Sequence, residues 1–340
     1  MPPKSDNIVN LQEKQAWQVA LTNLITDPLE LFALLQLDLA LLDGAFASAK
    51  QFPLKVPRSY VARMQKGNAA DPLLRQILPV DRELDVISGY TLDPLQEAEV
   101  NPVPGLLHKY HGRVLVTLTG VCALHCRYCF RRHFPYDLNT PGKPGWQKIL
   151  AYIQEDSSIK EVILSGGDPL VVSDRMLAQF GEQLALIPHV KTLRIHTRLP
   201  IVIPERVTET LLLALTQSKL QLVMVVHANH AQEINHEVKA ALLQLREHGI
   251  TVLNQTVLLK GINDHVDSLV HLSETLFSAQ VLPYYLHVLD KVQGTAHFDI
   301  DRHEAIRLHQ SLCQRLPGYL VPRLVYEQAG HYAKTIIGVR

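Results

Sequence analysis

The feature that most constrains this chain is a group of three closely spaced cysteines, Cys122, Cys126 and Cys129. They directly follow residues 113–119, a run of β-branched residues and leucines that predicts a buried strand. The three thiols therefore lie in one loop where a strand ends. Three thiolates can hold three irons of a 4Fe–4S cluster and leave the fourth iron open to a small molecule, whereas electron-transfer clusters usually take four cysteines.

The spacing of these thiols leaves two other interpretations open. With His125 or His133 as a fourth ligand, they could hold a zinc ion. They could also be three unrelated buried thiols. Crowding of three of the four cysteines is not typical of a disulfide framework, and it fits a reducing compartment.

Composition and charge narrow the class of protein. Hydrophobic residues make up 47% of the 340 residues and charged residues 19%, which suits one large domain, or one domain with an appendage, around a sizeable core. The formal net charge is zero, so neither nucleic acid nor a membrane surface is expected as a partner. The first residues lack the apolar segment of a signal peptide. We therefore expect a soluble cytoplasmic protein.

From residue 113 onward, strand-length apolar runs alternate with helix-length amphipathic segments. The expected strands are 113–119, 160–165, 191–197, 220–227, 250–259, 282–289 and 321–327. The expected helices are 174–187, 206–217, 232–248, 265–280 and 302–316. A strand begins about every 30 to 45 residues, as in repeating β-α units, and such runs predict a parallel sheet buried on both faces.

Nearly every expected strand ends in polar or charged residues. In parallel α/β barrels the active site is built from the carboxyl ends of several strands, whereas an open sheet concentrates its site at one switch point. We therefore predict an α/β fold with a partial (β/α) TIM-like barrel of about six to seven parallel strands and an N-terminal helical region.

The segment before the barrel has a different character. Residues 8–50 show helical spacing, and Asp27-Pro28 predicts the end of one helix and the start of the next. Residues 51–112 contain many prolines and only short helical pieces. We expect residues 1–105 to form a helical covering region and residues 106–340 to form the barrel, including the C-terminal lysine segment.

Several polar residues at the strand ends are candidates for chemistry. The segment Gly166-Gly167-Asp168 lies where a strand ends, and its glycines remove side-chain bulk there. Backbone groups of this segment can therefore approach a ligand closely and grip an amino group. An ordinary strand-to-helix turn is the plainer interpretation of these three residues. His227 and His230 could be ligands, or simply histidines hydrogen-bonded in place.

Gln255 and Lys334 are further candidates. Gln255 is a polar residue in an apolar strand, and if it is buried a ligand is one way to satisfy its amide. Most lysines near a C-terminus are solvated, but Lys334 lies in the apolar segment 330–338 after a strand-like run. A lysine drawn into an apolar site becomes nucleophilic toward aldehydes, as pyridoxal phosphate requires.

Six motifs occur in order along the chain. They are Asp71-Pro-Leu-Leu-Arg-Gln, His108-Lys-Tyr-His-Gly-Arg-Val, Cys126-Arg-Tyr-Cys-Phe-Arg-Arg, Leu164-Ser-Gly-Gly-Asp-Pro-Leu, His196-Thr-Arg and Asn254-Gln-Thr-Val-Leu-Leu-Lys-Gly-Ile-Asn. With the cysteine spacing they resemble the lysine 2,3-aminomutase family of the radical S-adenosylmethionine superfamily, from about residue 60 onward. Within it, the short chain is similar to members that supply β-lysine for modifying translation elongation factor P.

The resemblance implies an isomerase that converts L-α-lysine into β-lysine. It implies a 4Fe–4S cluster, S-adenosyl-L-methionine and pyridoxal 5′-phosphate as cofactors. The implied partners are L-lysine, elongation factor P with its lysyl-ligase, and a flavodoxin-like electron donor. No nucleic acid or membrane partner is implied.

The resemblance also implies roles for single residues. Cys122, Cys126 and Cys129 would ligate the 4Fe–4S cluster. Gly166, Gly167 and Asp168 would bind the methionyl amine of S-adenosylmethionine. The nucleoside and cofactor space would be lined by His227, His230 and Gln255. Lys334 would bond covalently to pyridoxal phosphate, with Arg113 near the cofactor phosphate. The substrate would be held by Arg131 at its carboxylate and by Asp290 and Glu327 at its distal ammonium.

The chain departs from the family pattern in three places. Gly330-His-Tyr-Ala stands where a glycine-rich run usually precedes the lysine, and Glu327 stands where aspartate is typical, so its carboxylate reaches further. The chain also stops six residues past Lys334. Longer aminomutases carry an extension there that helps them to oligomerise, so a monomer or a different small oligomer is expected.

Two alternative functions stay open. A radical enzyme of the same kind could act on another amino acid such as glutamate, although carboxylates at Asp290 and Glu327 argue against an acidic side chain. The second alternative is a zinc-stabilised adaptor without catalysis.

Overall fold

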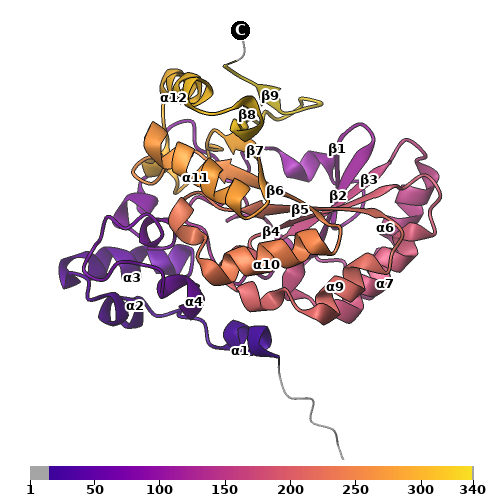
Figure 1. The fold of residues 1–340 in the computed structure, drawn as a ribbon, viewed down its shortest axis with the longest axis horizontal. Helices are drawn as coiled ribbons and strands as arrows, with labels where there is room; N and C mark the ends of the chain where they lie inside the picture. The colour runs from indigo at the N-terminus through magenta and orange to yellow at the C-terminus, as the bar shows by residue number, and fades with distance from the viewer. Residues whose placement is uncertain (1–14, 339–340) are drawn as a thin grey trace, which may run out of the picture.

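The computed structural model describes residues 15–338 of the chain, and one nine-stranded sheet organises them (Figure 1). The strands, which follow one another in the sheet in chain order, are β1 (Leu106–Tyr110), β2 (Arg113–Thr119), β3 (Glu161–Gly166), β4 (Thr192–Thr197), β5 (Gln221–His227), β6 (Thr251–Val257), β7 (Leu282–His287), β8 (Arg323–Tyr326) and β9 (Thr335–Ile336). β2 to β8 are parallel, whereas β1 and β9 pair antiparallel with their neighbours. The seven parallel strands confirm the predicted partial barrel.

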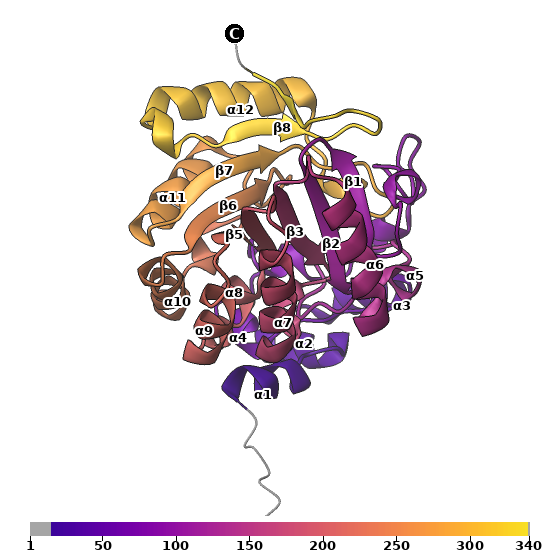
Figure 2. The same ribbon diagram turned by 90° about the vertical axis from the view of Figure 1, so that its right-hand side faces the viewer.

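The described residues also form twelve α-helices. Their bounds are α1 (Ala16–Thr22), α2 (Pro28–Leu35), α3 (Leu42–Gln51), α4 (Arg58–Val61), α5 (Tyr136–Asn139), α6 (Gly142–Glu155), α7 (Asp174–Ala185), α8 (Leu199–Val202), α9 (Glu209–Thr216), α10 (His236–Glu247), α11 (Val266–Ser278) and α12 (Arg302–Arg315). Figure 2 shows the six long helices from α6 to α12 around the outside of the curved sheet. The polar residues that follow the strands therefore lie in the loops at the carboxyl ends of the strands.

Side-chain caps fix where several of these helices begin. Ser173 accepts from Met176 N–H at the start of α7, and Asn235 accepts from Val238 N–H at the start of α10. The predicted break at Asp27-Pro28 is confirmed, because the Asp27 carboxylate accepts from Leu29 N–H at 2.9 Å and begins α2. The capping residues Ser173, Asn235 and Asp27 thus fix where the loop before each of these helices ends.

The N-terminal region packs on the carboxyl edge of the sheet, at the lower left in Figure 1. Its buried residues, such as Phe32 and Tyr60, belong to the same apolar cluster as Val116 and Ile195 of the sheet. The division at residue 105 stays a prediction, although β1 begins one residue later. Residues 8–14 of the predicted helical segment, and the first residues compared with a signal peptide, lie outside the described part of the chain.

Several elements were not singled out from the sequence, namely the strands β1 and β9 and the helices α5, α6 and α8. In β1 only Leu106 and Leu107 are buried, and the polar residues after them hide the strand pattern. β9 has two residues, too few to show any period. Between residues 15 and 338, no helix combines the length and the apolar character needed to cross a membrane.

Candidate active site

The cysteine loop is held against the end of β3. Gly167 N–H donates to Thr119 O at 2.7 Å, and Asp168 N–H donates to Val121 O at 2.8 Å. A Cβ atom at Gly167 would lie 2.4 Å from Val121 O, and one at Gly166 would lie 2.7 Å from Thr119 O. The two glycines are therefore required by the close approach of the cysteine loop itself.

The three thiols lie close enough to affect one another's protonation. Burial and the neighbouring Cys126 raise the pKa of the Cys129 thiol to about 11. Burial, Cys129 and Asp168 raise the pKa of Cys122 well above its usual range. Such thiols become thiolates when a metal supplies compensating positive charge. The donor set therefore suits an iron–sulfur cluster.

A buried arginine lies beside one of these sulfurs. Arg198, just after β4, places Nη1 2.7 Å from the Cys126 sulfur and Nη2 2.8 Å from a Glu233 oxygen. Asp168 accepts from Arg198 N–H at 2.7 Å and from the Thr197 hydroxyl at 2.6 Å. Burial raises the pKa of Asp168, although these hydrogen bonds oppose the shift. The carboxylate of Asp168 thus links the glycine segment to the arginine beside the thiols.

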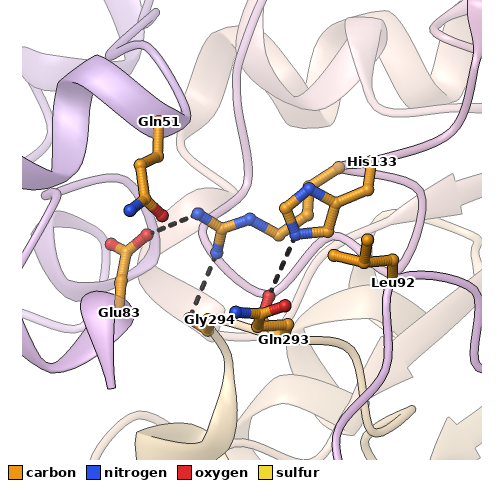
Figure 3. A pocket seen from close by; sticks show the side chains of 7 residues that line it. Gln51, Glu83, Leu92, His133, Gln293 and Gly294 are labelled. Carbon is orange, nitrogen blue, oxygen red and sulfur yellow. Dashed lines mark hydrogen bonds and ion pairs between the residues drawn. The ribbon is translucent and has the colours of Figure 1, made fainter. Parts of the chain in front are cut away.

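Neither histidine of the zinc interpretation turns its ring toward the thiols. His125 hydrogen-bonds Pro53 O at 2.8 Å and stacks on Phe52. His133 approaches Gln293 O at 3.3 Å and lines a surface cavity of about 350 Å³ (Figure 3). Within the described residues, no three Cys, His, Asp or Glu side chains converge on one metal ion. Sulfurs around a single zinc lie roughly 3.8 Å apart, whereas ligands to different irons of a cluster can be more widely spaced.

The candidates on β5 and β6 are divided between two environments. His227 and Gln255 are partners in the β5–β6 register, and His227 Nε2 lies 3.0 Å from the Tyr128 hydroxyl. Burial and the Arg198 charge lower the pKa of His227 to about 3, so its ring is neutral. The third candidate, His230, instead accepts from Gln232 N–H and begins a short 3₁₀ turn.

The amine of Lys334 points into a cluster of charged side chains. It forms an ion pair with Glu327, which also accepts from the Tyr110 hydroxyl at 2.8 Å and from Lys109 at 3.2 Å. Burial alone would raise the pKa of Glu327, but Lys334 and then Lys109 lower it below its usual range. Arg113 stacks over the Tyr110 ring at 4.8 Å, so it lies close to this cluster.

Asp290 is the unpaired acid of the cluster. Among the described residues, no side chain or backbone N–H donates to its carboxylate. Burial and the nearby Glu327 raise the pKa of Asp290 to about 7, against the opposing charges of Lys334 and Lys109. A cation entering the cluster would therefore find this carboxyl group free.

Two half-buried histidines near Lys334 carry buried ring nitrogens without a partner in the described part of the chain. His196 Nε2 and His287 Nε2 have no hydrogen-bond partner among the described residues. Burial lowers the pKa of both rings, and the Lys334 charge contributes to the shift. Buried polar atoms normally have partners. These two orphaned atoms fit a site that receives a polar cofactor, such as pyridoxal phosphate, beside Lys334.

Arg131 is buried, but its guanidinium already has a partner. Arg131 Nε and Nη2 form a bidentate pair with Glu97 at 2.7 and 2.8 Å. Although burial opposes the shift, Arg131 and Lys109 lower the pKa of Glu97. The structure therefore brings together Lys334, Glu327 and Asp290 in one cluster, which Lys109 and Glu97 connect to Arg131.

Sequence reasoning missed Glu97, Lys109, Tyr110 and Arg198 as site residues. Glu97 lies in a proline-rich stretch without periodicity and meets its partner 34 positions away. Arg198 was visible as a charged residue at a strand end, which is the one signal that could have singled it out. Lys109 and Tyr110 belong to the unexpected strand β1.

The chain was compared with protein families and with curated proteins. The model of the Radical SAM superfamily matches residues 116–272. Three proteins named L-lysine 2,3-aminomutase match nearly end to end. That of Escherichia coli is 48% identical over 96% of each chain, that of Haemophilus influenzae 46% over 96% of each, and that of Buchnera aphidicola 44% over 97% of this chain and 98% of its own.

Proposed function

Because this chain belongs to the L-lysine 2,3-aminomutase family of the radical SAM superfamily, we propose that it is an isomerase that moves the amino group of L-lysine from Cα to Cβ. The observation that carries the proposal is the charged cluster around Lys334. It offers a primary amine and the unpaired carboxyl group of Asp290, and contacts through Lys109 and Glu97 connect it to Arg131. Lysine, which carries one carboxylate and two ammonium groups, matches these charges.

The cofactors proposed are a 4Fe–4S cluster held by Cys122, Cys126 and Cys129, S-adenosylmethionine, and pyridoxal phosphate at Lys334. When bound, the cluster and S-adenosylmethionine supply a carbon-centred radical, and pyridoxal phosphate supplies a covalent hold on the substrate amine. Arg198 places a positive charge beside Cys126, and this charge favours the thiolate form of Cys126, which is the form that ligates a metal.

The remaining residues would orient the ligands. Gly166, Gly167 and Asp168 lie against the cysteine loop, where the methionyl amine of a cluster-bound ligand would be. His227 and Gln255 are neighbours in register and would line the nucleoside space, and we place His230 at the edge of that space. Arg113 has no carboxylate partner among the described residues, so it remains able to meet a phosphate.

The charges also favour lysine over an acidic amino acid. Asp290 and Glu327 would repel a side-chain carboxylate, whereas they suit the distal ammonium of lysine. In the absence of cofactor both oxygens of Glu327 have partners in the chain. The distal ammonium is therefore proposed to meet Asp290 first.

We extend the proposal to the cellular role. The chain and three bacterial relatives match over nearly their whole lengths. We propose a role in the cytoplasm, where β-lysine would be supplied for elongation factor P through its lysyl-ligase. A flavodoxin-like protein is the proposed electron donor.

The decisive test is anaerobic reconstitution with iron, sulfide, pyridoxal phosphate, S-adenosylmethionine and L-lysine. We expect about four irons per chain and conversion of free L-lysine into a single β-lysine enantiomer, measured by chiral chromatography. One zinc per chain and no turnover would instead identify a non-catalytic adaptor. Conversion of glutamate in place of lysine would refute the substrate.

The affinity for lysine is expected to depend on pH through Asp290. With a pKa of about 7, its carboxyl group is protonated in the empty enzyme below pH 7. A bound ammonium favours the carboxylate, so binding releases a proton below pH 7 and none above it. Affinity should therefore rise by up to about tenfold per pH unit as the pH approaches 7, and then level off.

Asp290→Asn is expected to abolish this pH dependence and to weaken lysine binding at pH 8 by about tenfold or more. Calorimetric titration of the unreduced enzyme, which cannot turn over, gives both quantities. Asp267→Asn, in an exposed ion pair with Arg315, is the matched control and should behave as the wild type. An unaltered pH profile in Asp290→Asn would exclude Asp290 as the ammonium site.

A further inference from the structure

Glu97 holds one edge of the Arg131 guanidinium. A guanidinium carries five N–H groups: two on a side edge, formed by Nε and Nη2, two on a terminal edge, formed by Nη1 and Nη2, and one on Nη1 that points back along the side chain. Glu97 takes the side edge with contacts of 2.7 and 2.8 Å. Nη1 has one long contact of 3.3 Å, to the Ser165 hydroxyl. One N–H on each terminal nitrogen is thus left for another acceptor.

Glu97 is itself fixed in place. It begins a short 3₁₀ turn, Glu97–Val100, and its backbone N–H donates to the Asp93 carboxylate at 3.1 Å. Its side chain is 4% exposed, and Lys109 Nζ lies 3.1 Å from the oxygen that also meets Arg131 Nη2. Leaving this position would strand a buried carboxylate, which is strongly unfavourable. Glu97 is therefore a permanent partner of Arg131.

The faces of the guanidinium are also restrained. Phe130 lies 4.9 Å and Phe134 5.8 Å from the Arg131 guanidinium carbon, measured to the ring centroids. The ring of His196 feels the charges of both Arg131 and Lys334, so it lies within range of both groups, and its Nε2 is unpaired. Both the guanidinium and the amine thus lie near the same unsatisfied ring nitrogen.

We propose that Glu97 is a positioning residue that turns the terminal edge of Arg131 toward the carboxylate of the bound amino acid. The inference rests on the proposed lysine aminomutase function and adds a residue to its substrate site. Arg131, Glu97 and Lys109 together carry one positive charge, which keeps the site attractive to a carboxylate even though Glu97 neutralises its arginine partner. Lys109 also reaches Glu327, so the same contacts connect both ends of the substrate site.

The sign of the effect of Glu97→Gln separates positioning from charge. Removing the negative charge would tighten carboxylate binding if charge alone mattered. However, a glutamine amide has one acceptor oxygen, and its NH₂ group cannot accept from either nitrogen of the side edge. One N–H of Arg131 would lose its partner and the guanidinium would turn. We therefore expect lysine binding to weaken by about tenfold.

The experiment measures dissociation constants by calorimetry on the anaerobically reconstituted, unreduced enzyme. The probes are L-lysine and 1,5-diaminopentane, which lacks the carboxylate. Glu97→Gln should weaken lysine and leave diaminopentane within about twofold, whereas Glu97→Asp, which keeps the charge, should recover part of the lysine affinity. In an Arg131→Met background, Glu97→Gln should add no further loss, because Glu97 acts through Arg131.

Glu304→Gln is the matched control, because Glu304 also pairs with an arginine, Arg307, but on the exposed surface of α12. It should leave the affinity for lysine unchanged. Tighter lysine binding in Glu97→Gln would overturn the proposal and make Glu97 a competitor of the substrate carboxylate. Equal affinity, or equal loss for both probes, would also overturn it. If the wild type itself binds no lysine, the proposed function fails together with this inference.

Discussion

Replacing Lys334 with alanine is expected to abolish lysine turnover, with a loss of at least about a thousandfold. The amine of Lys334 forms an ion pair with Glu327 near Asp290, and it would be the covalent attachment point for pyridoxal phosphate. Without this amine, pyridoxal phosphate would have no covalent attachment among the charged side chains around residue 334. Chiral product analysis and the visible absorbance of lysine-bound pyridoxal phosphate would show both losses.

The cysteine loop should be unaffected by this substitution, so the iron content of Lys334→Ala should equal that of the wild type. Lys160→Ala is the matched control, because Lys160 is an exposed lysine whose amine contacts only Ser157 O. It should retain full turnover and absorbance. Turnover by Lys334→Ala at the wild-type rate would refute the role of Lys334.

Cys126→Ala should lose most of its iron and all cleavage of S-adenosylmethionine. Cys126 is the central cysteine of the loop, and the neighbouring Arg198 guanidinium would be left facing a methyl group instead of sulfur. A two-cysteine loop cannot hold three irons of a cluster. Iron and sulfide analysis, with chromatography of the adenosine products, would measure the loss.

Cys313 provides the control for this experiment. It is the one cysteine outside the loop, exposed on α12, so Cys313→Ala should retain iron and activity. A Cys126→Ala protein that kept four irons and cleaved S-adenosylmethionine would show that the cluster lies elsewhere. Retention of a single zinc ion would contradict the cluster assignment altogether.

The fold could be predicted where the chain shows a long, regular pattern. The seven parallel strands lie close to the expected positions because each is a run of four to seven residues rich in apolar side chains, and all but the last are followed by a helix. β1 and β9 could not be predicted in this way. They are edge strands, short or partly polar, and their pairing with β2 and β8 depends on the rest of the sheet rather than on their own residues.

The site could be predicted where chemistry leaves a local signature. Three spaced cysteines and a lysine in an apolar segment are visible in the sequence alone. Glu97 and Lys109 are not, because an acid or an amine in a loop is usually solvated, and only the folded chain brings them to Arg131 and Glu327. The roles of the three cysteines, Lys334, Arg131 and Asp290 toward cofactors and substrate stay predictions.

The glycines at the end of β3 show a limit of the same reasoning. The sequence suggested that Gly166 and Gly167 make room for a ligand. In the structure the space beside both Cβ positions is filled by the backbone of Thr119, Gly120 and Val121. The two glycines are thus needed first of all for the contact between the end of β3 and the cysteine loop. This contact aligns the cysteine loop with Asp168.

The segment that carries Lys334 is joined to the sheet by very few contacts. β9 pairs with β8 through only two residue pairs, Val325 with Ile336 and Tyr326 with Thr335. Local opening of so short an edge requires much less free energy than unfolding of the central strands. Amide hydrogens at this edge should exchange with solvent long before those of β3 or β5. An amine that exchanges partners during turnover, as we propose for Lys334, would therefore move with this short edge while the central strands stay in place.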